Sequence, residues 1–333
     1  MNRRITLASR PVGLPKVSDF HLIYAPRPAL VGGQALVRSV YLALDPGTRG
    51  RMSEDYPYGK PLAIGEVISG DAVGLVVASE DPTLRAGDVV VGKLGWQEYT
   101  VTRGRELRRI DSGRAPISTA LGVLGVPGLA AFFGLLSICD PHAGETAVVS
   151  GAAGAVGMIA AQIAKLRGCR TVGVAGSDAK IAWLRDALGI DAVINYRTVP
   201  DLGKSLEELC PDGIDVYFDN VGGAVTDAVV GRINSGARIA VCGQLSQYNL
   251  ERPECGPRWL GQLVAKQAKM QGFLVSEHAE QFAVALEQLG DWLQAGKLRY
   301  RETVTLGIAG APQAFIGMLD GRNQGTQLVQ LTD

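Results

Sequence analysis

The segment TAVVSGAAGAVG, residues 146–157, constrains the fold of this chain more than any other. It opens with apolar, β-branched residues typical of a short buried strand and passes at once into glycine and alanine. The helical pattern AVGMIAAQIAKLRG follows and ends at Gly168. Strand, glycine turn and helix in this order indicate a unit of a parallel α/β sheet.

The same alternation continues along the chain. The next helix, SDAKIAWLRDALG, is predicted to have Ser177 as its N-cap and Gly189 just past its end. Alternating strands and helices predict a doubly wound parallel sheet with helices on both faces, a Rossmann-type domain. The further predicted strands are 171–176, 191–196, 214–222, 237–243 and 270–275, and the further helices are 204–210, 224–233 and 278–296.

The first 110 or so residues have a different pattern. Val-rich segments at 34–44, 70–79 and 87–102 are separated by Gly, Pro and Asp, and no helical period persists between them. They predict an all-β, barrel-like or sandwich-like domain. We expect the last segment, with strands near 300–307 and 326–331, to return to this domain. The predicted domains are therefore 1–122 with 300–333, and 123–299.

The overall composition narrows the class of protein. Basic and acidic residues number 33 each, which argues against nucleic acid or an anionic membrane as the main partner. The stretch 115–139 carries no charge, but Pro127 and several glycines interrupt it, so a buried segment is expected rather than a membrane span.

The cysteines and histidines favour neither a metal site nor a disulfide framework. There are five Cys, widely spaced, and three His. Reduced thiols in a cytoplasmic protein are expected, since the N-terminus also lacks the apolar region of a signal peptide. His142, in DPHAGE, is expected in a turn rather than as a base, and Trp96 fits either the core or a stacking position against substrate.

The glycine turn itself points to a bound dinucleotide. In the pattern Gly-x-Gly-x-x-Gly the first place is taken by Ala152, and Gly154 and Gly157 hold the other two. Gly154 lets the backbone approach a pyrophosphate, and Gly157 lets the helix pack close to the strand. An ordinary tight turn is the alternative, but the strand before and the helix after favour cofactor contacts at Ala153, Gly154, Val156 and Gly157.

The end of the second strand favours NADP(H) over NAD(H). An NAD site usually has an acidic residue there for the ribose 2′-hydroxyl, whereas Asp178 is expected one step later, in the first helical turn. Ser177, Lys180 and Arg197 supply the hydroxyl and cations that a 2′-phosphate requires. The alternative is a solvated, capped helix start.

Beyond these patterns, the sequence resembles a known family, the zinc-independent medium-chain dehydrogenase/reductases, and within it the NADPH-dependent alkenal/one oxidoreductases. That group contains the leukotriene B4 dehydrogenase/prostaglandin reductases and the plant double-bond reductases. The stretches that carry the resemblance span nearly the whole chain, in order: LALDPGTRGRM (42–52), GVPGLAAFFGL (125–135), SGAAGAVG (150–157), AGSDAKIAWL (175–184), YFDNVGG (217–223), CGQLSQYN (242–249) and AFIGMLDGRNQGTQLVQL (314–331).

The resemblance implies a GroES-like β domain and an inserted Rossmann domain. It implies NADPH-dependent reduction of a carbon–carbon double bond conjugated to a carbonyl, with hydride added to the β-carbon and an enolate intermediate, without a metal. Lys180 and Tyr196 match residues that contact the 2′-phosphate. The residues that match the rest of the cofactor site are Asn220, Val221, Cys242, Gly243 and Asn323.

Tyr248 matches the family tyrosine near the nicotinamide ribose and the reacting carbonyl. A hydroxyl donor is chemically suitable there because the enolate oxygen becomes negatively charged. The alternative is a loop tyrosine that packs on its neighbours. Two family positions differ: Gly47 replaces a frequent tyrosine, whose volume Tyr56 or Tyr58 is expected to fill, and Ala130 replaces a frequent threonine.

The sequence supports three hypotheses about function. The favoured one is an enal and enone reductase, supported by the GQLSQYN and DGRNQG segments. Quinone reduction uses the same scaffold and cofactor, and a non-catalytic NADPH-binding sensor is the alternative of another class. The resemblance also implies a homodimer, joined through the sheet edge at 270–275, where an apolar strand needs a partner.

Overall fold

The computed structural model describes residues 1–56 and 59–331. The chain forms two compact units, Gly122–Arg301 and Met1–Leu121 together with Glu302–Asp333. We call them the α/β unit and the β unit, and describe each by itself.

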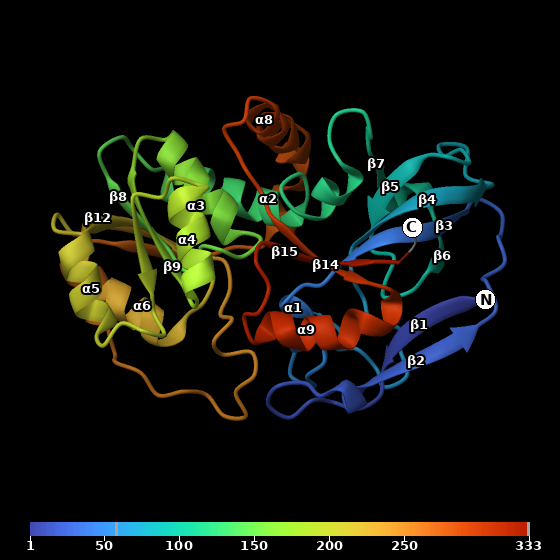
Figure 1. Cartoon of the computed structure of the whole chain (residues 1–333), viewed down its shortest axis with the longest axis horizontal. Coiled ribbons are helices and arrows are strands. Elements are labelled where there is room, and N and C mark those ends of the chain that lie inside the picture. The colour runs from blue at the N-terminus through green and yellow to red at the C-terminus, as the bar shows by residue number, and fades with distance from the viewer. Residues whose placement is uncertain (57–58, 332–333) are drawn as a thin grey trace. The chain divides into compact units, whose positions relative to one another are not determined.

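The α/β unit is built on a six-stranded parallel sheet in the order β10-β9-β8-β11-β12-β13. The chain starts at β8 in the middle, winds outward to β10, then returns to β11 beside β8 and winds the other way. Figure 1 labels β8, β9 and β12 of this sheet. The predicted doubly wound Rossmann sheet is thereby confirmed. Its strands are β8 (Thr146–Val149), β9 (Arg170–Ala175), β10 (Ala192–Asn195), β11 (Ile214–Asp219), β12 (Ile233–Val241) and β13 (Lys269–Gly272).

Helices cover both faces because neighbouring residues of each strand point to opposite sides. Val149 and Phe218 face one core, with α2 (Val126–Phe132), α3 (Gly157–Leu166), α4 (Asp178–Asp186) and α8 (Phe282–Gln294). Val148 and Tyr217 face the other core, with α5 (Leu202–Leu209), α6 (Gly223–Val230) and α7 (Leu260–Ala265).

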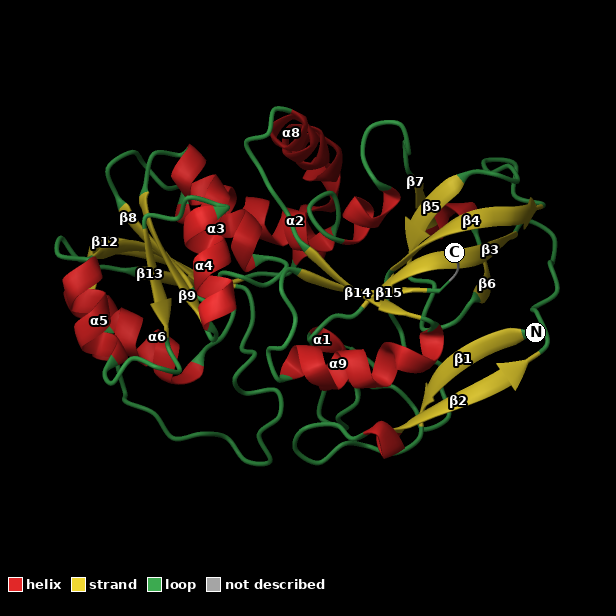
Figure 2. Ribbon diagram, viewed as in Figure 1, coloured by secondary structure: helices red, strands yellow, loops and turns green. Residues whose placement is uncertain are grey.

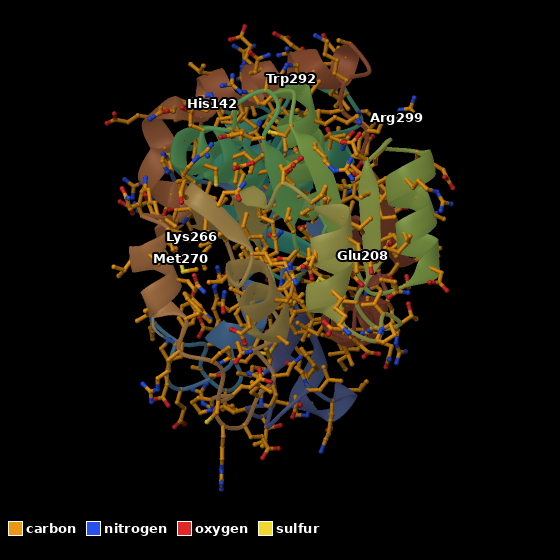
Figure 3. The ribbon with its side chains drawn as sticks, turned by 90° about the vertical axis from the view of Figure 1, so that its left-hand side faces the viewer. His142, Glu208, Lys266, Met270, Trp292 and Arg299 are labelled. Atoms are coloured by element: carbon orange, nitrogen blue, oxygen red, sulfur yellow. The ribbon has the colours of Figure 1, made fainter. Side chains whose placement is uncertain are left out.

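Several predicted bounds are wrong in this unit. The last helix begins at Phe282 rather than 278, because a 3₁₀ helix, Val275–Gln281, precedes it. Strand β13 ends at Gly272 and so covers only part of the predicted strand 270–275. It is the edge strand of the sheet, as expected, and its residue Met270 is labelled in Figure 3. Tyr196 and Arg197 follow β10 rather than end it.

The uncharged stretch 115–139 folds into short pieces. A 3₁₀ helix, Ile117–Leu121, is followed by α2 and by a π-helix, Phe133–Cys139. Within residues 1–56 and 59–331, no helix has the length and apolar character needed to cross a membrane.

The β unit contains a seven-stranded sheet, and Figure 2 shows how few helices accompany its strands. The C-terminal segment belongs to it, since β15 pairs antiparallel with β3. One short helix, α1 (Gly47–Arg51), lies where the sequence predicts none. The other elements are β1 (Asn2–Leu7), β2 (Phe20–Ala25), β3 (Ala35–Ala43), β4 (Ala72–Ser79), β5 (Val89–Gly92), β6 (Tyr99–Thr102), β7 (Leu107–Arg109), β14 (Glu302–Leu306), α9 (Ala311–Leu319) and β15 (Thr326–Gln330).

Trp96 lies in the core of the β unit. Its side chain is fully buried, stacked on Phe20 at 6.0 Å between ring centroids and edge-on to Phe315 at 5.5 Å. Of the two roles that the sequence allows for Trp96, the structure selects the packing role. Because Phe315 comes from α9, the C-terminal segment completes this core.

Candidate functional site

The turn after β8 is compact enough to require glycine at position 157. A Cβ on Gly157 would lie 2.2 Å from the Gly151 carbonyl oxygen and 2.8 Å from the Ala152 Cα, and backbone cannot move aside cheaply. Gly151 itself has φ +58°, which favours glycine. The turn therefore brings the positive end of the α3 dipole beside small side chains, a suitable setting for a phosphate.

The turns after β8 and β11 lie side by side. A Cβ on Gly151 would be 3.4 Å from Val221 Cγ2 and 3.5 Å from Asn220 Cβ. The Asn220 amide also donates to the Ser150 carbonyl oxygen at 2.7 Å. β8 and β11 flank the switch point at which the strand order of the sheet reverses, and open α/β sheets bind ligands at this point. The predicted contacts on the β8 turn are Ala153, which is buried, and Gly154 and Val156, which are half-buried.

The end of β9 carries no acidic side chain. Ser177 caps α4 as predicted, accepting from the Lys180 backbone N–H at 3.4 Å. Asp178 lies in the first turn as predicted, and its carboxylate accepts from the Asn195 amide at 2.7 Å. A Cβ on Gly176 would be 2.9–3.1 Å from the Tyr196 ring and hydroxyl. Tyr196 therefore lies where an NAD site would have its carboxylate.

Two cations lie close to this position. Burial lowers the pKa of the Lys180 ammonium, and the positive charge of Arg197 lowers it further. The Arg197 guanidinium is 5.9 Å from the centre of the Tyr196 ring. Because like charges destabilise each other, an anion between them would be favoured. The cluster of Ser177, Lys180, Tyr196 and Arg197 fits a phosphate ester.

The end of β12 brings Tyr248 to the same edge of the sheet. The backbone N–H groups of Cys242 and Gly243 donate to the Asp219 carbonyl oxygen at 2.8 and 3.1 Å. The half-buried Tyr248 hydroxyl accepts from the Gln244 backbone N–H at 3.3 Å and lies 3.4 Å from the Cβ position of Gly243. Tyr248 thus shares one edge with Asn220 and the glycine turn.

Known proteins match this chain in sequence and in fold. Residues 3–110 match the family described as the N-terminal domain of oxidoreductase, and residues 155–291 match the zinc-binding dehydrogenase family. The chain is 47% identical to the putative NADP-dependent oxidoreductase YfmJ of Bacillus subtilis, over 99% of this chain and 98% of that protein. It is 39% identical to the 2-alkenal reductase (NADP(+)-dependent) of Nicotiana tabacum, over 99% and 98%.

The chain belongs to the alkenal/one oxidoreductases of the medium-chain dehydrogenase/reductase superfamily. The crystal structure of CurA in complex with NADPH from Vibrio vulnificus matches this alkenal/one oxidoreductase with a TM-score of 0.95 and 42% identity, over 99% of each chain. The enzyme is an NADPH-dependent reductase, and the predicted cofactor, NADP(H), is confirmed.

The name of the second matched family raises the question of zinc. In the described part of this reductase, no group of three or more His, Cys, Asp or Glu side chains is arranged to hold a metal ion. All five cysteines are free thiols. The His142 side chain is 65% exposed, on the outer surface in Figure 3, with its Nε2 3.8 Å from an Asp140 oxygen.

The remaining predicted residues of this reductase belong to the β unit. The Tyr56 ring lies against α1, 3.5 Å from the Cβ position of Gly50, whereas Tyr58 lies outside the described residues. The Asn323 side-chain amide donates to the Gly325 carbonyl oxygen at 2.8 Å. At Gly47 the backbone N–H donates to Asp45 at 2.5 Å. These residues are therefore placed within their own unit, and their cofactor or substrate roles stay predictions.

The sequence patterns did not single out Ser150, Asp219 or Gln244. Ser150 directly follows β8, Asp219 ends β11, and Gln244 lies in the loop shortly after β12, in VVSG, YFDN and CGQ respectively. A polar residue at the carboxyl end of a buried parallel strand is the signal that finds them, because such ends face the ligand crevice. The resemblance in the motif YFDNVGG predicts cofactor contacts at Asn220 and Val221 instead.

Proposed function

We propose that the enzyme uses NADPH to reduce the carbon–carbon double bond of α,β-unsaturated aldehydes and ketones. Hydride adds to the β-carbon, negative charge moves to the carbonyl oxygen as an enolate, and a proton then adds to the α-carbon. Membership of the alkenal/one oxidoreductases and the tobacco relative's named activity support this substrate class.

The cofactor would be held by residues that fit it chemically. The positive end of the α3 dipole and the turn of Ala153, Gly154 and Gly157 suit a pyrophosphate. Lys180 and Arg197 suit the 2′-phosphate, beside Tyr196. Bound NADPH supplies the hydride, and this chain supplies the binding and the hydrogen bonds around the reacting groups.

One observation carries the catalytic part of the proposal. The Tyr248 hydroxyl lies at the carboxyl edge of the sheet, fixed by the Gln244 N–H at 3.3 Å. We therefore assign Tyr248 the role of hydrogen-bond donor to the developing enolate oxygen, because a hydroxyl at this edge of the sheet forms an interaction that strengthens as the charge develops.

The test replaces this hydroxyl and compares acceptors. Purified enzyme is mixed with NADPH or NADH and with 2-alkenals, enones or quinones, and the loss of reduced cofactor is followed. Tyr248→Phe should lower kcat on alkenals by about 100-fold, as expected for one lost oxyanion donor, while its NADPH Kd stays unchanged. Tyr24→Phe is the matched control, because that side chain is 64% exposed on β2 of the β unit.

The outcomes separate the alternatives. Full activity of Tyr248→Phe on alkenals would remove Tyr248 from the mechanism. Turnover of quinones alone would assign the enzyme to quinone reduction. Fast turnover of alkenals with NADPH, and slow turnover with NADH, is the result that we expect.

A further inference from the structure

Asp219, at the end of β11, is a fully buried carboxylate surrounded by hydrogen-bond donors. Its Oδ1 accepts from the hydroxyls of Ser150 at 3.0 Å and Tyr217 at 2.9 Å, and from the backbone N–H groups of Val221 and Gly222, both at 2.9 Å. Its Oδ2 accepts from the Thr226 hydroxyl at 2.6 Å and the Gln244 amide at 3.3 Å.

One side of this network reaches the turn after β8. The Ser150 hydroxyl donates to Asp219 and accepts from the Asn220 backbone N–H at 2.8 Å. The Asn220 amide donates back to the Ser150 carbonyl oxygen. Ser150 directly precedes Gly151, so these bonds fix the point from which the dinucleotide turn starts.

The other side reaches the loop after β12. The Gln244 amide donates to Asp219, and the Gln244 backbone N–H donates to the Tyr248 hydroxyl. A Cβ on Gly222 would lie 2.2 Å from Gln244 Oε1, so the Gln244 side chain packs tightly over the β11 turn. The position of Tyr248 is thus linked to Asp219 through one residue.

We propose that Asp219 is a positioning residue that sets the geometry of the cofactor turn and of the Tyr248 loop together. It acts through Ser150 on the turn and through Gln244 on the loop. The Ser150 branch depends only on NADP(H) binding, whereas the Gln244 branch rests on the proposed function of Tyr248.

The chemistry of the network requires a carboxylate. An ionised carboxylate only accepts hydrogen bonds, and every neighbour described above is a donor. Burial, together with the charge of Asp219, raises the pKa of Tyr217 well above its usual range, which keeps that hydroxyl protonated and donating. An asparagine at 219 would turn an NH₂ group toward donors and lose bonds on at least one side.

The same strands provide a control at their opposite ends. Asp215, near the start of β11, accepts from the Thr146 backbone N–H of β8 and from the Asn234 amide of β12, both at 2.8 Å. Asp215 therefore ties β8, β11 and β12 together as Asp219 does, but at the amino end. Asp215→Asn should cost stability without changing cofactor geometry.

The first experiment compares Asp219→Asn with Asp215→Asn in the full-length enzyme. NADPH Kd is measured by cofactor fluorescence, and Tm by thermal unfolding. Both variants should have a lower Tm. Only Asp219→Asn should bind NADPH more weakly, by about tenfold, which corresponds to about 1.4 kcal/mol.

The second experiment separates the two branches. Ser150→Ala should weaken NADPH binding and leave kcat on a 2-alkenal near wild type at saturating NADPH. Gln244→Met should lower kcat and leave the NADPH Kd unchanged. A merely structural network would lower Tm in both variants without this division between Kd and kcat. Ser150→Ala also keeps the test decisive if Asp219→Asn does not fold.

Two results would overturn the proposal. One is wild-type NADPH affinity in Asp219→Asn and Ser150→Ala; the other is an equal loss of affinity in Asp219→Asn and Asp215→Asn. If the wild type turns over no acceptor, the proposed substrate fails, whereas weak NADPH binding by Ser150→Ala alone would still support the role of Asp219 at the turn.

Discussion

A carboxylate holds strands together at each end of the parallel sheet, but the two carboxylates differ in their burial and in the charge of their partners. At the amino end, Glu145 pairs with Arg238 at 2.7 Å, and both side chains keep about a fifth of their surface exposed (21% and 20%). At the carboxyl end, Asp219 is fully buried and its donors are neutral hydroxyls, amides and backbone N–H groups. Glu145 joins the start of β8 to β12, on the far side of β11, whereas Asp219 joins the end of β11 to the segments that follow its neighbours β8 and β12.

The difference follows from what each end has to do. An amino end only has to be closed, and a partly solvated ion pair between flexible side chains serves there beside the bonds of Asp215 to Thr146 and Asn234. A carboxyl end has to hold turns that bind a ligand, so the bonds come from short, buried groups with little freedom. We therefore expect changes at the carboxyl end to alter binding and turnover, and changes at the amino end to alter stability alone.

The largest effect should come from Gly157→Ala. The added Cβ meets the Gly151 carbonyl oxygen at 2.2 Å, so the turn must shift by a large fraction of an ångström or more. A misplacement of about 1 Å can cost about 100-fold in reaction rate. We expect a loss of that size in kcat/KM for NADPH, together with weaker NADPH binding measured by cofactor fluorescence.

Gly261→Ala is the control for this change. Apart from its chain neighbours and its own helix backbone, no atom of the described residues lies within 4 Å of a Cβ there, and the residue is in α7, where alanine is preferred to glycine. Its NADPH affinity should equal that of the wild type. Normal NADPH binding by Gly157→Ala would contradict the proposed difference between the two ends of the sheet, because the turn at the carboxyl end would then tolerate displacement.

An intermediate effect is expected for Lys180→Met. Removing this charge should weaken NADPH binding by about tenfold, since a hydrogen bond to a charged group contributes about 1.5–3 kcal/mol, and it should leave NADH binding unchanged. Equal losses for both cofactors would mean that Lys180 acts on the fold of the β9–α4 turn rather than on a 2′-phosphate.

The pH dependence of the preference for NADPH over NADH provides a second test of Lys180. Burial and Arg197 lower the pKa of Lys180 in the free enzyme. A bound phosphate favours the protonated lysine and so raises that pKa, and binding takes up a proton. The preference for NADPH over NADH should therefore decline as the pH rises from about 7 to about 10. In Lys180→Met this decline should disappear.

The smallest effect should come from Glu145→Gln at the amino end. The loss should be about 1 kcal/mol of unfolding free energy, or about 2–4 °C in Tm, with unchanged NADPH Kd and kcat. Burial opposes the ionisation of Glu145, but bonds from Arg238 and from the His142 backbone outweigh it and lower its pKa.

The sign of the pH effect follows from this lowered pKa. The stability from Glu145 is fully present above its unfolded pKa and is lost as the pH falls through the folded pKa. The difference in stability between wild type and Glu145→Gln should therefore be full at about pH 7 and shrink as the pH falls below about 4. A change of NADPH Kd in this variant would show that the two ends are coupled.

Much of the fold could be predicted because its signals are local. The strand, glycine turn and helix over 146–168 are encoded within one contiguous segment, and so is the Ser177 cap of α4. Helix α1 was missed because five residues rich in glycine and arginine carry no helical period. The late start of α8 was missed because a 3₁₀ helix and an α-helix begin with the same apolar spacing.

By itself, the sequence determined the alternating α/β order, the dinucleotide turn and the positive charge that favours NADP(H), since each depends on residues close together in the chain. Only the tertiary structure decided that Trp96 is core, that Tyr196 covers Gly176, and that Asp219 joins Ser150 to Gln244. Those contacts depend on strand order, because Ser150 and Gln244 lie 69 and 25 residues from Asp219 in the sequence and meet it only when β8, β11 and β12 become neighbours.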